Sequence, residues 1–282
     1  MGNKKYHIGL YEKAMPSALN WEEKLQCARD CGYDFVEISI DESDARLARL
    51  EWTAQERAQL RETMQKIGVP IRSMCLSGHR KYPFGASDPA VRRRSLEIME
   101  KAIQLSDDLG IRVIQLAGYD VYYEEGSEQT RKDFADNLKK AVEMAAVHGV
   151  VLGFETMETE FMNTVAKSMK YVDLIDNPYL GVYPDVGNLT NAAKTYGTSV
   201  LDDLETGRGH LVAIHLKETV PGKFREIPFL TGHVDFPAVI RKGWQLGVRR
   251  FVTEMWDTGK PEWKADICFA HDKMSEILDT ME

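Results

Sequence analysis

The sequence predicts a closed (β/α)₈ TIM barrel, in which parallel strands alternate with helices around one core. Short apolar runs alternate with longer amphipathic runs along the whole chain. Several amphipathic runs end in a glycine just before the next apolar run, as expected where a helix stops. No Pro-, Ser- or Gly-rich linker interrupts the 282 residues. We therefore expect a single domain over residues 1–282, a length that such barrels commonly have.

Eight apolar runs are expected to form the strands. In chain order they are YHIGLY, YDFVEISI, IRSMCLS, IRVIQLAG, VVLGFE, YLGVYPD, LVAIHLK and RRFVTEMW. A doubly wound open sheet is the alternative arrangement for alternating strands and helices. It is disfavoured because no GxGxxG pattern follows the first run, where a dinucleotide-binding fold would carry it.

Between these runs, apolar residues recur at every third and fourth position, which is the spacing of one helix face. The expected helices cover residues 21–31, 53–67, 88–109, 129–148, 163–176, 236–246 and 262–281. The segment between the sixth and seventh strands is less regular, and there we expect only a short helix near residues 198–206. Glycine is expected to end five helices, within CGYDF, IGVPI, LGIRV, HGVVL and LGVRR.

The composition indicates a soluble globular protein with a large core, because 43% of the residues are hydrophobic and 28% are charged. The net charge of −8 disfavours nucleic acid as a partner. No stretch of 18 apolar residues occurs, and the first residues, MGNKKYHIGLYEK, lack the apolar core of a signal peptide. We therefore expect a cytoplasmic protein that neither binds nor crosses a membrane.

The four cysteines, Cys27, Cys31, Cys75 and Cys268, are too few and too scattered for a disulfide framework. This favours a reducing compartment. Cys27 and Cys31 are four residues apart, but no second Cys or His pair has the spacing of a zinc site. We expect these two residues to be small buried side chains.

Polar side chains occur at the ends of all eight predicted strands, where a barrel assembles its active site. In chain order they are Tyr11 with Glu12, Glu37, Ser77 with His79 and Arg80, Gln115, Glu155 with Glu158, Asp185 with Asn188, His215 with Lys217, and Glu254 with Trp256.

Four of these residues, Glu155, Asp185, His215 and Glu254, end the last four strands. One acid at a strand end is often a helix N-cap or half of a salt bridge, and a lone histidine in an apolar strand is often a core residue. Together, however, they would crowd like charges in a dry site, which is costly without a cation. The set predicts a site for Mn²⁺, Mg²⁺, Co²⁺ or Zn²⁺, and its oxygen-rich character favours the harder ions.

With these residues, the chain resembles the sugar-phosphate 3-epimerases of the xylose-isomerase-like TIM-barrel superfamily, which interconvert L-ribulose 5-phosphate and L-xylulose 5-phosphate. The similar stretches extend nearly end to end: GLYEKAMP, FVEISIDESDARLARL, SMCLSGHRKYPFG, IRVIQLAGYDVYYEE, YPDVGNL, LVAIHLKET and FVTEMW. The resemblance implies that a metal ion is held by the four residues named above. It also implies that the two glutamates are the acid and the base, and that Glu158 and Lys217 contact substrate hydroxyls, although related free-ketose enzymes typically carry Arg near position 217.

The implied reaction removes the proton at C3 of a ketopentose phosphate and returns it to the opposite face through a cis-enediolate. A cation chelated by the C2 and C3 oxygens would stabilise the negative charge. Glu155 and Glu254, one on each face, would take and return the proton, with their roles exchanged in the reverse direction. Asp185 and His215 would mainly hold the ion.

The substrate phosphate needs cationic or N–H donors near the rim of the barrel. The candidates for this role are His79, Arg80, Lys217, Lys223 and Arg225. Tyr11 and Trp256 are candidates to form walls of the pocket, and Asn188 is a further candidate for contact with the substrate. A homodimer is expected because this is the commonest oligomer. L-ascorbate degradation and other pentose use both stay open as pathways.

Three other functions stay open at this point. An aldose–ketose isomerase or another ketose 3-epimerase could use the same scaffold and metal. A phosphodiesterase of the endonuclease IV type would use a histidine-rich zinc cluster, but most of the seven histidines lie outside the strand ends and the chain is acidic. A metal-free binding or regulatory barrel is the third.

Overall fold

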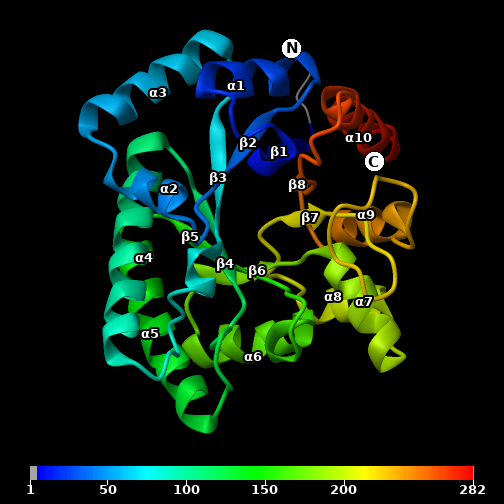
Figure 1. Ribbon diagram of the computed structural model, residues 1–282. Helices are drawn as coiled ribbons and strands as arrows, with labels where there is room; N and C mark the ends of the chain where they lie inside the picture. Colours follow the sequence, from blue (N-terminus) through cyan, green and yellow to red (C-terminus); the bar gives the residue numbers. More distant parts are fainter. Residues whose placement is uncertain (1–4, 282) are drawn as a thin grey trace.

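The computed structural model describes residues 5–281 and has the predicted barrel architecture (Figure 1). Eight parallel strands lie in the order β6-β5-β4-β3-β2-β1-β8-β7. The strands are β1 His7–Tyr11, β2 Phe35–Ser39, β3 Ile71–Leu76, β4 Val113–Ala117, β5 Val151–Glu155, β6 Leu180–Tyr183, β7 Ile214–Leu216 and β8 Arg250–Thr253. All eight predicted strands are confirmed. The extent of the domain over residues 1–282 stays a prediction.

The barrel closes between β6 and β7 through two isolated parallel bridges, Val182 with Leu211 and Asp185 with His215. Backbone hydrogen bonds support this closure, since His215 N donates to the Pro184 carbonyl at 2.9 Å. The short β7 and the end of β6 therefore meet only at a few positions. One of these positions places Asp185 directly beside His215.

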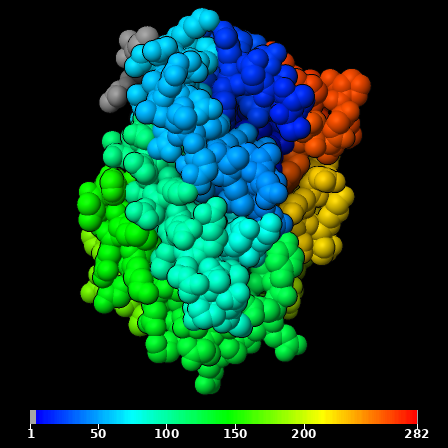
Figure 2. Space-filling model, turned by 60° about the vertical axis from the view of Figure 1, so that its left-hand side comes forward, coloured from blue at the N-terminus to red at the C-terminus, as the bar shows by residue number. Residues whose placement is uncertain are grey.

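Helices surround the strands, and the seven predicted longer helices are confirmed. They are α1 Trp21–Asp30, α3 Ala54–Ile67, α4 Pro89–Leu109, α5 Glu128–Val147, α6 Val165–Ile175, α9 Phe236–Gln245 and α10 Trp263–Leu278, with shorter elements α2 Asp44–Leu47, α8 Val200–Thr206, η1 Glu12–Ala14, η2 Ala48–Glu51, η3 Ser77–Arg80 and η4 Glu160–Met162. Figure 2 shows that residues from the blue to the green part of the chain make up most of one face of the molecule. No helix among residues 5–281 combines the length and the apolar character that a membrane crossing requires.

The sequence-based prediction lacks the longer helix α7 Val186–Tyr196 as well as the short α2 and the four η elements. Helix α7 starts directly after β6, where the side chain of Asp185 accepts a hydrogen bond from Asn188 N at 2.7 Å. This N-cap stabilises the first turn of the helix. The helix is hard to predict because glycine, asparagine and threonine in VGNLTNAAKTY are poor helix formers. The predicted short helix near residues 198–206 is confirmed as α8.

The interior of the barrel is lined by alternate residues of each strand, since every second residue of a strand points to the same face. A small apolar cluster inside includes Phe35 of β2 and Ala213 just before β7. Two residues further along, Glu37 and His215 point to the same side and are fully buried. The larger core lies between the strands and the helices. The interior therefore changes from apolar to polar toward the carboxyl ends of the strands.

The expectation that no disulfide forms is corrected by the structure, in which Cys31 and Cys268 are bonded. They lie 237 residues apart, at the end of α1 and within α10. Pairing of β1 with β8 brings the first and last units of the barrel together. The spacing of the cysteines in the sequence does not reveal this contact, so the sequence does not predict the disulfide. The expected burial of Cys27 and Cys31 is confirmed. Cys27 and Cys75 are free thiols.

Candidate metal centre

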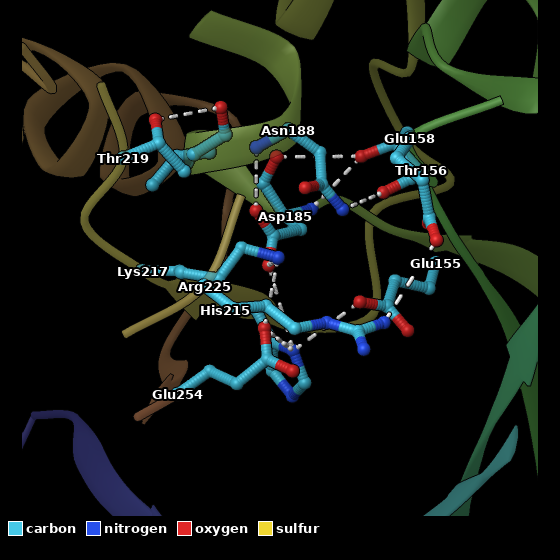
Figure 3. A network of polar contacts seen from close by, with 12 residues as sticks. Glu155, Thr156, Glu158, Asp185, Asn188, His215, Lys217, Thr219, Arg225 and Glu254 are labelled. Carbon is cyan, nitrogen blue, oxygen red and sulfur yellow. Dashed lines mark hydrogen bonds and ion pairs between the residues drawn. The ribbon is translucent and has the colours of Figure 1, made fainter. Parts of the chain in front are cut away.

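The four predicted metal ligands come together at the carboxyl ends of the strands (Figure 3). Glu155 is the last residue of β5, Asp185 follows β6, His215 lies in β7, and Glu254 follows β8. One potential ligand atom from each residue lies within 4.8 Å of the others. All four are buried, with 5% or less of each residue exposed. This geometry can close on a single ion.

The imidazole of His215 presents Nδ1 to the three carboxylates. Nδ1 lies 3.3 Å from Glu254 Oε2, 3.9 Å from Glu155 Oε1 and 4.0 Å from Asp185 Oδ2. The other ring nitrogen, Nε2, lies 2.6 Å from Glu37 Oε1 on the far side. Nδ1 therefore faces three carboxylates, and Nε2 faces a fourth, that of Glu37.

Lys217 adds a buried ammonium group to the cluster. Its Nζ lies 2.7 Å from Asp185 Oδ2 and 3.2 Å from Glu254 Oε2. Apart from ion pairs with Lys217 and His215, these two oxygens have no hydrogen-bond donor in the described part of the chain. Buried carboxylate oxygens normally have such partners. The residues present therefore fit a divalent cation, which would complete the coordination of these oxygens.

The cluster holds too many acids to ionise together. Burial, reinforced by the charge of Glu254, raises the pKa of Glu155 to about 8, and burial raises the pKa of Asp185 to about 7. Burial also acts to raise the pKa of Glu254, but Lys217 and His215 outweigh it and hold that pKa well below its usual range. One acid is thus ionised at the expense of its neighbours. A further positive charge would allow all three to ionise.

A cavity of about 50 Å³ opens above this cluster, and a neighbouring cavity of about 360 Å³ shares its wall. The predicted residues that line the smaller cavity are Tyr11, Arg80, Glu155, Glu158, Asn188, Lys217, Arg225, Glu254 and Trp256. Lys217, Glu254 and Trp256 line both cavities. Asp185 and His215 have no exposed surface. Two of the four candidate ligands, Glu155 and Glu254, therefore face the cavity directly.

The rim of the smaller cavity is rich in cations gathered around one acid. Tyr119 donates a 2.6 Å hydrogen bond to Glu158 Oε2. The guanidinium groups of Arg80 and Arg225 lie 3.9 and 3.8 Å from Glu158 Oε1. Arg225 also lies over the ring of Trp256, 5.6 Å from its centroid. Two arginines share a single carboxylate, so the rim keeps excess positive charge that suits an anionic group.

Two predicted substrate residues lie elsewhere. His79 is buried, with Nε2 3.1 Å from the Ser95 carbonyl and its ring against Phe84. Burial lowers the pKa of His79 to about 4, so its imidazole is neutral at pH 7. Lys223 is exposed on the loop between β7 and α9. Within residues 5–281, the cavity lining includes neither side chain, whereas Arg225 of the same loop does line it.

The structure adds residues to which the sequence assigned no role. Glu37 contacts His215 from β2, and Gln115 Nε2 of β4 lies 3.1 Å from His215 Nδ1. Lys13, which follows β1, lines the cavity. Glu37 and Gln115 stood among the polar strand ends, and the alternation of their strands could have placed both inside the barrel.

The fold and the site together define a TIM-barrel protein with a candidate metal centre at the mouth of the barrel. Residues 25–271 match the family described as xylose isomerase-like TIM barrel. The structure is also similar to solved structures of an L-ribulose 3-epimerase (TM-score 0.78, 19% identity, 98% of this chain and 95% of the other) and of D-psicose 3-epimerase from Clostridium cellulolyticum H10 (TM-score 0.79, 14% identity, 96% and 99%). At these identities the likeness supports the fold alone.

Sequence relatives narrow the assignment. The chain is 48% identical over 260 residues to the putative L-ribulose-5-phosphate 3-epimerase SgbU of Escherichia coli strain K12, covering 90% of each chain. It is 44% identical over 273 residues to the L-ribulose-5-phosphate 3-epimerase UlaE of Escherichia coli O157:H7, covering 96% of this chain and 95% of the relative. The chain belongs to the L-ribulose-5-phosphate 3-epimerase family of the xylose isomerase-like TIM barrels.

Proposed function

We propose that the protein is a metal-dependent isomerase that interconverts L-ribulose 5-phosphate and L-xylulose 5-phosphate by inverting C3. The observation that carries this proposal is that only two of the four candidate ligands line the cavity. Glu155 and Glu254 both line the cavity, whereas Asp185 and His215 lie fully buried behind them. Two carboxylates can therefore touch both a cation and a substrate, as an acid and a base at one carbon must.

The four candidate ligands would hold a divalent cation, which when bound supplies a Lewis acid that stabilises negative charge on the substrate oxygens. One glutamate, Glu155 or Glu254, takes the proton from C3 as a carboxylate. The other, in its protonated form, returns a proton to the opposite face of the planar carbon. The two exchange roles in the reverse direction, so no proton is gained or lost over the cycle.

The other residues around the cavity would bind and orient the substrate. Glu158, Lys217 and Asn188 all line the cavity, and the first two would contact hydroxyl groups of the substrate. Arg80 and Arg225 would bind the phosphate, because both line the cavity and, among residues 5–281, each forms an ion pair within 4 Å only with the single carboxylate of Glu158. Tyr11 and Trp256 would form apolar walls, with ring centroids 6.1 Å apart.

Three carboxylates and one imidazole suit Mn²⁺, Mg²⁺ or Co²⁺, and Zn²⁺ is also compatible. We favour the harder ions because oxygen ligands dominate the set. The homodimeric assembly and the cytoplasmic location stay predictions.

The test is proton exchange in D₂O with L-xylulose 5-phosphate and the protein loaded with Mn²⁺, followed by NMR. We expect deuterium at C3 and the appearance of L-ribulose 5-phosphate. Deuterium at C1 or C2 would instead indicate an aldose–ketose isomerase. Turnover of free L-xylulose as efficient as that of its phosphate would contradict the sugar-phosphate assignment and favour another ketose 3-epimerase.

A further inference from the structure

We infer that Glu37 is a positioning residue of the metal centre, which holds His215 so that Nδ1 and not Nε2 faces the cation. This inference rests on the metal centre of the proposed function. Glu37 lies on β2, across the barrel from β7, and has no exposed surface. Its Oε1 lies 2.6 Å from His215 Nε2. Glu37 is outside the four ligands, and its side chain acts through the imidazole.

The carboxylate of Glu37 is itself held in place from two further strands. Its Oε2 accepts hydrogen bonds from Ser73 Oγ of β3 at 2.7 Å and from Tyr183 Oη, at the end of β6, at 2.9 Å. The ring of Tyr183 also packs edge-on against His215, with centroids 4.8 Å apart. Because two hydroxyls fix Oε2, Oε1 stays directed at the imidazole. A partial rotation of the carboxylate would lengthen its hydrogen bonds to Ser73, Tyr183 and His215 together.

The contact with Glu37 decides which nitrogen of His215 can bind a metal ion. A neutral imidazole carries one N–H donor and one nitrogen with a free lone pair, and only the latter can bind a metal ion. Because Oε2 of Glu37 accepts from two hydroxyls, Oε1 is free to accept a hydrogen bond from the imidazole, and this contact selects the tautomer with the proton on Nε2. The lone pair is then on Nδ1, the nitrogen within 4.0 Å of Glu155, Asp185 and Glu254. An outer carboxylate of this kind also raises the basicity of the ligand nitrogen.

A purely structural role for Glu37 is the competing explanation. In that case Glu37 would only satisfy Ser73, Tyr183 and His215 inside the barrel, and its loss would change stability without changing metal affinity. The two explanations therefore differ in metal binding and in the tautomer of His215. Neither measurement involves the substrate, so the result does not depend on whether the protein proves to be an epimerase.

The first experiment compares Mn²⁺ binding by calorimetry for wild type, E37Q and S73A, after removal of metal with EDTA. E37Q keeps the size of the side chain but replaces the charged acceptor. We expect E37Q to bind Mn²⁺ about 10- to 100-fold more weakly, the range typical for loss of an outer carboxylate. S73A is the matched control, because it removes one donor to Glu37 and leaves the contact with His215. We expect its affinity to fall much less than that of E37Q, because Glu37 keeps its contact with the imidazole and its hydrogen bond from Tyr183.

The second experiment needs no variant of Glu37, so it remains valid if E37Q does not fold. Wild-type protein labelled with ¹⁵N-histidine is loaded with Zn²⁺, and the signals of His215 are identified by their loss in H215Q. We expect a proton on Nε2 and none on the metal-bound Nδ1. A proton on Nδ1 with Nε2 bound to the metal, or Mn²⁺ affinity of E37Q equal to that of wild type, would overturn the inference.

Discussion

Two clusters of charged side chains lie at the same mouth of the barrel. They differ in which sign of charge is in excess. Glu12, just after β1, is fully buried and pairs with three cations, with Lys24 and Arg46 at 2.8 Å and Arg49 at 2.6 Å. The metal centre, around Glu155, instead combines three carboxylates with one lysine and one histidine. The first cluster has more cations than acids, and the second has more acids than cations.

The difference appears in the pKa values of two glutamates that look alike in the sequence. Burial acts to raise the pKa of Glu12, but Arg49, Arg46 and Lys24 outweigh it and lower that pKa to about 2. Burial and Glu254 raise the pKa of Glu155 to about 8. A buried acid at a strand end is thus structural where the chain supplies its countercharge. It is a candidate ligand where the chain does not.

The largest effect should come from removing the acid or the base. We expect Glu155→Gln and Glu254→Gln each to lower the rate of C3 exchange about 10²- to 10⁴-fold, because an amide can neither take nor return a proton. The rate is measured by deuterium incorporation from D₂O at saturating Mn²⁺. Full activity in either variant would remove that residue from the proposed proton transfer and would weaken the contrast with Glu12.

A smaller effect, on stability, should follow from Glu12→Gln. The variant leaves the buried Lys24 and the half-buried Arg46 and Arg49 without this carboxylate, so we expect a loss of about 3 to 5 kcal/mol in the free energy of unfolding. The measurement is urea denaturation of wild type and variant.

The difference in stability between wild type and Glu12→Gln should depend on pH. The pKa of Glu12 in the folded protein, about 2, lies below its ordinary value of 4.5. The stability that Glu12 contributes is therefore complete above about pH 4.5 and is lost as the pH falls toward 2. The difference between wild type and variant should shrink over this window. A difference that stayed constant down to pH 2 would contradict the ion cluster.

The smallest effect should be the response to metal. We expect EDTA to lower the melting temperature and Mn²⁺ to restore it, because an ion at 100 times its Kd stabilises the folded state by about 2.7 kcal/mol. Glu12→Gln should show the same rise on adding Mn²⁺, and Asp185→Asn should show a much smaller one. A melting temperature indifferent to chelator would favour a metal-free binding barrel.

Much of the site could be predicted because all strands of a parallel barrel end at the same mouth. The residues that end the predicted strands are therefore expected to lie together. Glu155, Asp185, His215 and Glu254 needed only the barrel rule to be grouped, and the structure brings them together. The roles of basic residues could not be assigned in the same way. Lys223 and Arg225 are two positions apart on one loop, yet only the path of that loop places Arg225 at the rim.

The sequence by itself determined the alternation of strands and helices and the types of residue at the strand ends. Hydrophobic periodicity and helix-ending glycines are local signals, and they encode the order of elements. The tertiary structure alone decided the pairing of Asp185 with His215, the disulfide between Cys31 and Cys268, and the contact of Glu37 with His215. These contacts join residues 30 to 237 positions apart in the sequence. They exist only because closing the barrel brings distant strands together, and no local pattern of residues records that closure.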